Sequence, residues 1–189
     1  MRKLIALLLI SVGAYYFYTR NATSSHLTLP DSIAWRFVTH IGSNSSPGVG
    51  VVLLHGDCWR LEWKTPASPT AFTAVFDGSK FASSAPGATV ELNPRIPMQK
   101  LLASIGPPRS TELHDGRQCW RFSRRYQGNP EQVWVDTQTH FPVFVDGTRS
   151  DGTHFDARYS ILPIETATHS AKLFDTRSTA SQFSQFLTP

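Results

Sequence analysis

The chain has 189 residues, of which 40% are hydrophobic and 17% charged, a composition that excludes a globally disordered polypeptide. Arg2, Lys3 and Arg20 lie in residues 1–20, which contain no acidic residue, so the remainder has 15 of the 18 basic residues against all 14 acidic ones. A domain this close to neutral does not support a nucleic-acid surface, and we expect no nucleic-acid partner. Thirteen Pro and twelve Gly residues favour a turn-rich β domain over a helical bundle.

The N-terminal segment predicts export. Two basic residues precede LIALLLISVGAYYFY (residues 4–18), which is uncharged, and this pattern is typical of a signal peptide. Two interpretations stay open: cleavage after Ala14, where small residues have the required spacing, or a short transmembrane anchor formed by residues 4–18, with tyrosines at the membrane interface. Both place the domain outside the cytoplasm, in the periplasm or an equivalent compartment.

The first half of the domain predicts antiparallel strands. Apolar and polar residues alternate over residues 32–41, which indicates a half-buried strand. Two hairpins follow, each with a glycine-containing turn, and their strands are expected over residues 49–55 with 58–65 and 71–76 with 80–83. The sequence ATVEL predicts a further strand over residues 88–92.

One internal helix is predicted over residues 97–105 (PMQKLLASI). Its apolar residues recur at helical spacing, its proline suits a first helical turn, and Gly106-Pro107 supplies a stop signal. The region from Ala167 onwards is mostly polar with a few Leu and Phe residues, and a short helix is expected there.

The segment over residues 117–163 is the most strongly patterned part of the chain. Aromatic and β-branched residues alternate with polar ones in RQCWRFSRRY, EQVWVDTQTHFPVFVDGTR and THFDARYSILP. Asn129-Pro130 and Ser150-Asp151-Gly152 separate these runs as turn signals. We therefore predict an antiparallel meander, and a mainly β (α+β) domain of about eight to ten strands with one or two helices.

The two cysteines lie on predicted strands. Cys58 is in CWRLEW and Cys119 is in CWRFSR, so that in each strand Cys and Arg share one face while Trp shares the other with Leu or Phe. An exported protein meets an oxidising environment. We hypothesise a Cys58–Cys119 disulfide, with two free buried thiols as the alternative.

Motifs for catalysis are weak or missing. The sequence VVLLHGDCW resembles the oxyanion strand of α/β-hydrolases, but the chain has no Gly-x-Ser-x-Gly elbow to present a nucleophile. The seven histidines are scattered without metal-ligand spacing, and no phosphate loop is present. We expect no metal, no cofactor and no enzymatic activity, and a hydrolase without a recognisable motif is the weakest alternative.

The aromatic residues are the informative excess of this sequence. All five tryptophans fall in predicted strands, and an apolar sheet face must be covered by a helix or filled by a ligand. We assign the ligand-binding residues from strand phase alone, and a shift of one residue would place them on the opposite face. The predicted residues are Trp35, Phe37, Trp59, Leu61, Trp63, Trp120, Phe122 and Trp134. The alternative is a plain core in which these side chains pack under the predicted helix.

Three segments together resemble a known family. TAVFDGSKFASSAPGATVEL is similar to a DG-turn hairpin of periplasmic lipoprotein carriers, VWVDTQTHFPVFVDGTRSDGTHFDARYSI resembles the strand, DG turn and strand of the same family, and LPIETATHSAKLFDT resembles its C-terminal segment. These matches lie within residues 73–92 and 119–176. The chain thus resembles the LolA-like superfamily, which includes lipoprotein carriers, outer-membrane lipoprotein receptors and envelope-sensing regulators.

The resemblance implies a fold and a function. The expected fold is a curved antiparallel sheet that forms an unclosed half-barrel, with one or two helices on its concave side enclosing an apolar cavity. The expected function is non-catalytic binding of a lipid or lipoprotein acyl chain near a membrane surface; the alternative is a membrane-tethered regulatory module with a filled core that binds another envelope protein. The expected segments are a signal peptide or anchor (1–20), a linker (21–31), the half-barrel domain (32–176) and a C-terminal tail (177–189).

Overall fold

The computed structural model describes residues 27–42, 46–68, 70–164 and 170–188. The predicted signal peptide or anchor over residues 1–20 and most of the predicted linker lie outside these described residues. Within them, no helix is both long and apolar enough to cross a membrane.

Ten strands form one antiparallel sheet with the order β5-β4-β3-β2-β1-β10-β9-β8-β7-β6. Each half of the chain forms a five-stranded meander, and the first and last strands join the two halves by pairing Trp35 with Ile161 through to Ile41 with Phe155. The strands are β1 (Ser32–Ile41), β2 (Gly48–His55), β3 (Cys58–Lys64), β4 (Phe72–Phe76), β5 (Phe81–Ser83), β6 (Ser110–His114), β7 (Arg117–Tyr126), β8 (Asn129–Asp136), β9 (Pro142–Thr148) and β10 (His154–Ile161).

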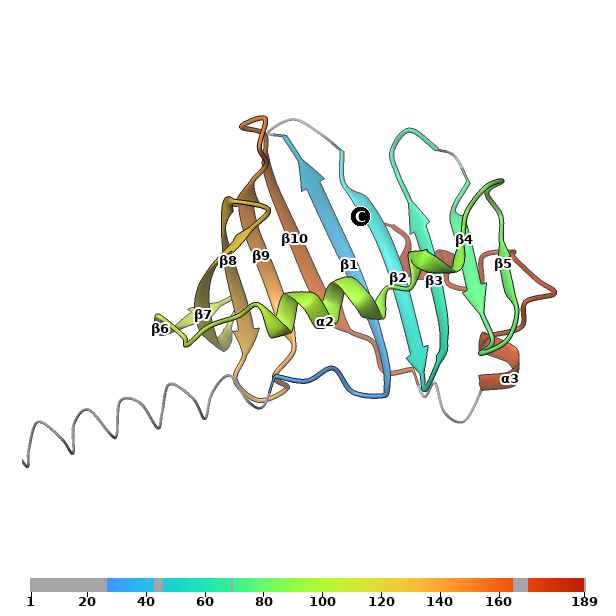
Figure 1. Cartoon of the computed structure of the whole chain (residues 1–189), viewed down its shortest axis with the longest axis horizontal. Coiled ribbons are helices and arrows are strands. Elements are labelled where there is room, and N and C mark those ends of the chain that lie inside the picture. The colour runs from blue at the N-terminus through green and yellow to red at the C-terminus, as the bar shows by residue number, and fades with distance from the viewer. Residues whose placement is uncertain (1–26, 43–45, 69, 165–169, 189) are drawn as a thin grey trace, which may run out of the picture.

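The sheet is open, because β5 and β6 lie at its two edges and do not pair with each other. Figure 1 shows a curved sheet with a single helix crossing its concave face. This is the unclosed half-barrel that the resemblance to the LolA-like superfamily predicts, so the predicted fold class is confirmed.

The crossing helix is α2 (Arg95–Ala103), and it leads from the first meander to the second across the concave face. The prediction of a helix here is confirmed, with a start two residues earlier than expected. Pro97 falls in the first turn, where a missing N–H removes no intrahelical bond. The Asn93 side-chain oxygen accepts a hydrogen bond from the Arg95 backbone N–H at 3.0 Å, and the buried face of the helix carries Met98, Leu101 and Leu102.

The strand predicted over residues 88–92 is wrong, because Val90–Leu92 forms a 3-10 turn. The backbone N–H of Leu92 donates to the Thr89 carbonyl, and that of Asn93 donates to the Val90 carbonyl. The segment must leave the edge strand β5 and reach the concave face to begin α2. The segment therefore turns away from the open edge of β5, and the local 3-10 hydrogen bonds satisfy its backbone instead.

The two faces of the sheet carry separate apolar cores. The concave core packs α2 against side chains that include Trp35, Val52 and Leu54. On the opposite face, the C-terminal part of the chain packs against Val49, Val51 and Leu53. Strand β2 (GVGVVLLH) is therefore buried on both faces, as its nearly continuous apolar sequence indicates.

The C-terminal part of the chain covers the convex face with α3 (Ser170–Leu173) and a 3-10 turn (Ser184–Phe186). A short helix in this region was predicted and is present. The apolar side chains that this part contributes to the convex core are Leu173, Phe174, Phe183 and Leu187. The last two belong to the predicted tail over residues 177–189, so this segment packs against the sheet.

The hypothesised Cys58–Cys119 disulfide is wrong, since both cysteines are free. Cys58 begins β3 and Cys119 lies in β7, and six interstrand steps separate these two strands in the sheet order. At about 4.8 Å a step, the Cα atoms lie far beyond the roughly 7 Å that a disulfide can bridge. The strand phase of the two residues was compatible with a bond, but phase does not determine which strands are neighbours.

Candidate ligand-binding pocket

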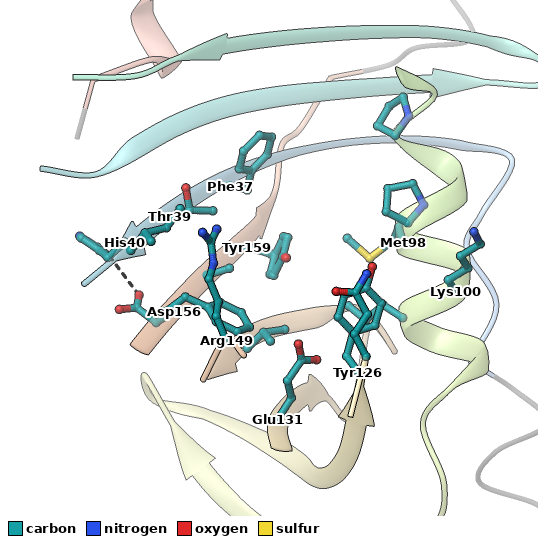
Figure 2. A pocket seen from close by; sticks show the side chains of 18 of the residues that line it. Phe37, Thr39, His40, Met98, Lys100, Tyr126, Glu131, Arg149, Asp156 and Tyr159 are labelled. Carbon is teal, nitrogen blue, oxygen red and sulfur yellow. Dashed lines mark hydrogen bonds and ion pairs between the residues drawn. The ribbon is translucent and has the colours of Figure 1, made fainter. Parts of the chain in front are cut away.

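An open pocket of about 960 Å³ lies between α2 and one end of the concave face. Its wall on one side is α2, and its floor is formed by strands β1–β3 and β7–β10. Figure 2 shows the pocket with α2 beside it and side chains entering from several strands. The helix covers only part of the concave face, and the part beyond it is the pocket.

Glycines in the neighbouring strands let aromatic rings lie down on the pocket floor. Phe37 of β1 pairs with Gly50 of β2, and its ring lies where a Gly50 side chain would be: an added Cβ atom would come within 2.1 Å of the Phe37 Cζ atom. In the same way, a Cβ atom on Gly147 would meet the Phe155 ring at 2.9 Å. The floor is hollow because these rings lie flat against backbone.

The part of the pocket over β2, β3 and the first half of β1 is apolar. Its lining includes Trp35, Phe37, Val52, Leu61 and Trp63 from the strands, with Leu92 and Ile96 from the segment that begins α2. The side chains at its mouth are unusually exposed for large apolar groups: Trp63 is 39%, Leu92 41% and Ile96 43% exposed. Exposed apolar groups around a hollow mark a surface suited to bind an apolar ligand.

The part of the pocket over β7, β8 and β10 contains the polar groups. Arg124 and Glu131 form an ion pair in which the Arg124 Nε atom is 2.6 Å from a Glu131 carboxylate oxygen, with 9% and 4% of the two side chains exposed. Arg124 also donates to the Ser104 hydroxyl at 2.6 Å, and its guanidinium lies 5.1 Å from the centre of the Tyr126 ring. The pair thereby ties β7 and β8 to the residue that follows α2.

Tyr159 of β10 lines the pocket beside this ion pair, and Figure 2 shows its hydroxyl within the hollow. Burial raises the pKa of Tyr159 to about 12, with Glu131 acting in the same direction and Arg124 opposing it. The phenol is therefore protonated at neutral pH. Among the described residues, its hydroxyl has no hydrogen-bond partner, so it is available to a bound molecule.

Two further cations line the pocket: Arg149 in the β9–β10 turn and Lys100 on α2. Within the described part of the chain, neither side chain forms an ion pair or a hydrogen bond. In Figure 2 the guanidinium of Arg149 points into the pocket, towards Tyr159 and Thr39. Asp156 also lines the pocket, but it pairs with His40 at 3.0 Å.

The structure brings together half of the predicted ligand-binding residues. Trp35, Phe37, Leu61 and Trp63 line the pocket. The first three are on the concave face as strand phase predicted, and they pack with the concave core.

The other four predicted residues lie elsewhere. Trp59 is 1% and Phe122 0% exposed, and both are packed inside the concave core without lining the pocket. Trp120 also packs against that core, with its ring 5.3 Å from that of His140. Trp134 does not share their face, because its neighbours Val133 and Val135 occupy the concave side of β8.

On the convex face, the Trp134 indole N–H donates to Glu112 at 2.5 Å. The ring of His114 stacks on Trp134 and on Phe144, with centroid distances of 5.1 and 4.7 Å. Trp134 therefore belongs to an aromatic cluster on the convex face, which lies outside the pocket.

The polar groups and the glycines were missed by sequence reasoning. Arg124 and Glu131 meet because β7 pairs with β8 in a register that places them opposite each other, and Arg149 lies in a turn where no strand phase applies. Glycine inside a strand pattern is a signal of close approach by another group. Gly50 and Gly147 both lie inside strands, and the close approach of a ring to each of them was not predicted.

The arrangement suits non-covalent binding of a molecule that is part apolar and part polar. Within the described residues, no group of three or more His, Cys, Asp or Glu side chains is placed to hold a metal ion. The groups that line the hollow are chiefly aromatic and aliphatic, with the Arg124–Glu131 ion pair, the Asp156 carboxylate beside His40, and two cations that form no ion pair within the described residues.

No family model and no curated protein matches the sequence. Three of the similar solved structures are MucB in complex with MucA(peri) (13% identity, TM-score 0.42, covering 80% of this chain and 57% of that chain), a LolA superfamily protein from Nitrosomonas europaea (11%, 0.35, 74% and 89%), and an uncharacterized conserved protein from Thermus thermophilus (12%, 0.46, 87% and 96%). The chain thus spans little more than half the length of the MucB chain.

These TM-scores are all below 0.5, so we base no functional conclusion on the three structures. The fold of this chain is defined by its strand order, the position of α2 across the concave face, and the pocket beside α2. They agree with the LolA-like half-barrel expected from the sequence.

Proposed function

We propose that this protein binds the acyl chain of a lipid or lipoprotein in the concave pocket, outside the cytoplasm and without covalent chemistry. The observation that carries the proposal is an open hollow of about 960 Å³ with a floor of aromatic and aliphatic side chains that α2 leaves uncovered. This volume falls within the range of roughly 300–1,000 Å³ typical of small-molecule sites.

Binding would be driven by removal of apolar surface from water, which contributes about 0.8 kcal/mol for each buried CH₂ group before the entropy of association is subtracted. Phe37, Leu61 and Trp63 are the residues against which the chain would pack. The proposed location outside the cytoplasm is supported by the signal-like segment over residues 4–18. A membrane surface is then the source of the ligand.

The test is saturable binding of an anthroyloxy-labelled stearic acid to the purified protein. We expect Thr39→Trp, which places an indole on the pocket floor, to weaken binding at least tenfold, since it occupies the volume the chain would use. Thr111→Trp on β6 is the matched control, because Thr111 is exposed and does not line the pocket, and it should bind as the wild type does. A folded wild-type protein that shows no saturable binding would end the proposal.

A second proposed function is a regulatory module that binds another envelope protein. The observation that favours it is the edge strand β6, which pairs only with β7 in the described sheet and carries Leu113 with 78% of its surface exposed. Added strands bind such edges through backbone hydrogen bonds. If this function is correct and the first is not, Leu113→Lys should abolish capture of the partner while the labelled fatty acid fails to bind any variant.

A further inference from the structure

The two ends of the pocket differ in polarity, and the strand order makes this difference a direction in space. Running along the floor from β3 through β2, β1, β10, β9 and β8 to β7, the lining changes from Trp63, Leu61 and Phe37 to Tyr159, Glu131 and Arg124. An apolar site that becomes polar at one end matches a molecule that does the same.

The helix preserves this direction because it is held at both ends. At its start, Arg95 donates to the backbone carbonyls of Asp31 and Gly56, at 3.0 and 2.8 Å, beside β1 and β3. Just after its end, the Ser104 hydroxyl accepts a hydrogen bond from Arg124 of β7. The apolar residue Ile96 thus lies over the apolar end, and Lys100 lies towards the polar end.

The charges at the polar end are not balanced within the pocket. Arg124 is neutralised by Glu131, and the Asp156 carboxylate, which lies 3.0 Å from the His40 ring, is the one other carboxylate of the described lining. Arg149 and Lys100 remain as two positive charges without an ion-pair partner among the described residues. Asp151 lies in the same turn as Arg149. Its pKa is lowered chiefly by hydrogen bonds with Thr153 and to a smaller extent by the Arg149 charge, so the two side chains interact only weakly.

Hydrogen-bonding capacity is available at the same place. The Tyr159 hydroxyl lies in the hollow without a protein partner among the described residues (Figure 2), and Arg149 lines the same pocket. A protonated phenol and a guanidinium both donate hydrogen bonds, and a lining that offers donors together with positive charge favours an anion. A neutral apolar ligand would leave these donors without partners, which is unfavourable.

We infer that the ligand is an amphiphile with an anionic headgroup, a carboxylate or a phosphate. The headgroup lies at the β7–β10 end of the pocket, bound by Arg149 and the Tyr159 hydroxyl, and the hydrocarbon chain runs towards Phe37, Leu61 and Trp63. This inference rests on the proposed acyl-chain function and adds the charge and the orientation of the ligand to it.

The experiment compares ligands of one chain length that differ only in headgroup. Hexadecanoic acid, hexadecyl phosphate and hexadecanol are titrated against the full-length protein by displacement of an uncharged fluorescent acyl probe, and inorganic phosphate is tested alone. We expect both anions to bind about tenfold more tightly than the alcohol at low salt, with the difference decreasing as ionic strength rises. The anion that gains more identifies the headgroup as carboxylate or phosphate, and either result supports the inference.

Charge-removing variants locate the headgroup. Arg149→Gln should remove most of the preference for the anions while leaving the affinity for hexadecanol unchanged, and Lys100→Gln should act in the same direction with a much smaller effect, since Lys100 lies on the outer side of α2 in Figure 2. Arg109→Gln is the matched control, because Arg109 is exposed and lies outside the pocket, and it should keep the full preference.

The outcomes separate the inference from the proposed function. Equal affinity of the wild type for hexadecanoic acid and hexadecanol would overturn the inference and leave acyl-chain binding standing. Inorganic phosphate binding as tightly as hexadecyl phosphate would overturn the inference as well, since the hydrocarbon chain would then contribute nothing. If none of the three hexadecyl ligands displaces the probe, the proposed function itself has failed.

Discussion

Phe37 lies flat on the sheet because its partner in β2 is Gly50. Any side chain at position 50 would have to push the ring upwards, into the space that forms the pocket. The same relation holds between Phe155 and Gly147 on the other half of the floor. The depth of the pocket thus depends on Gly50 and Gly147, because neither has a Cβ atom that would push the neighbouring ring upwards.

Gly50→Ala should therefore close part of the pocket. Because the new Cβ atom would lie 2.1 Å from the Phe37 ring, the ring must turn away, and we expect weaker binding of the labelled fatty acid together with a loss of about 1–3 kcal/mol in the free energy of unfolding, typical of overpacking. Fluorescence titration and urea denaturation measure the two effects.

Two further variants show whether the clash is the cause. Gly106→Ala should change neither quantity, since a Cβ atom there meets no atom within 4 Å. Adding Phe37→Ala to Gly50→Ala removes the ring that collides, so binding should be tighter than in Gly50→Ala alone but weaker than in the wild type, because Phe37 is also one of the residues against which the acyl chain would pack. Full binding by the single Gly50→Ala variant would contradict this account of the pocket floor.

At the level of elements, strand β3 holds the C-terminal segment through a buried ion pair. Arg60 and Glu62 are both 0% exposed, with 2.7 Å between the Arg60 Nε atom and a Glu62 carboxylate oxygen. Glu62 accepts hydrogen bonds from the backbone N–H groups of Gln182 and Phe183 and from the Ser181 hydroxyl. A charged pair thus fixes a segment more than one hundred residues away along the chain.

Glu62→Gln should release this segment. The change leaves the Arg60 charge buried without its partner, and breaking a buried pair in this way destabilises a protein by about 3–5 kcal/mol. Urea denaturation should show the loss, and trypsin should cleave faster after Lys172 and Arg177.

Asp175→Asn provides the comparison, since it removes the carboxylate of an ion pair whose arginine, Arg177, is 89% exposed. An exposed pair contributes little to stability, so the free energy of unfolding should change far less. Equal effects of Glu62→Gln and Asp175→Asn would show that the buried pair does not hold the segment.

Alternation along each strand predicted most of the elements, and its failures have particular causes. β1 and β3 were predicted because their apolar residues recur with the period of a strand, and β2 because its run is apolar and β-branched. Residues 88–92 have the composition of a strand, but the chain turns away from the edge of β5 there to begin α2 on the concave face. The alternation in CWRLEWK correctly placed Arg60 and Glu62 on one face, yet it did not reveal that this face is buried, because what covers it is distant in sequence.

The candidate pocket was predictable only in its apolar half. Strand phase placed Trp35, Phe37 and Leu61 on the same face, because each lies in a regularly alternating strand. The prediction that Trp134 lines the pocket failed because the valines on either side of it occupy the concave face. The polar half depends on which strands pair and on a turn residue, Arg149, and neither is visible from periodicity.

Across the whole molecule, the two cysteines lie on opposite halves of the sheet, and both are free. We expect two alkyl groups per chain when the protein is denatured and alkylated without reductant, measured by intact-mass spectrometry. Burial is the main cause that raises the pKa of both thiols, so alkylation of the native protein should be slow. The melting temperature should be the same with and without reductant.

A protein isolated from an oxidising compartment provides the stringent form of this test. If it takes up no alkyl group before reduction and two afterwards, the cysteines are paired, and the arrangement of the two halves of the sheet would have to be different. Cys58→Ser is the companion variant: it should leave one alkyl group per chain and no dimer linked through Cys119.

The pairing of β1 with β10 has a consequence for how the chain reaches its final form as it folds. Each meander is built from hairpins that close over short distances, but the seam between them joins Ser32–Ile41 to His154–Ile161, and such distant pairing is slow. A chain that crosses a membrane from its N-terminus would present β1 as a long unpaired edge until its final strand arrives. That interval is when it is most open to aggregation with other copies, and a chaperone that shields this edge would increase the yield of folded protein.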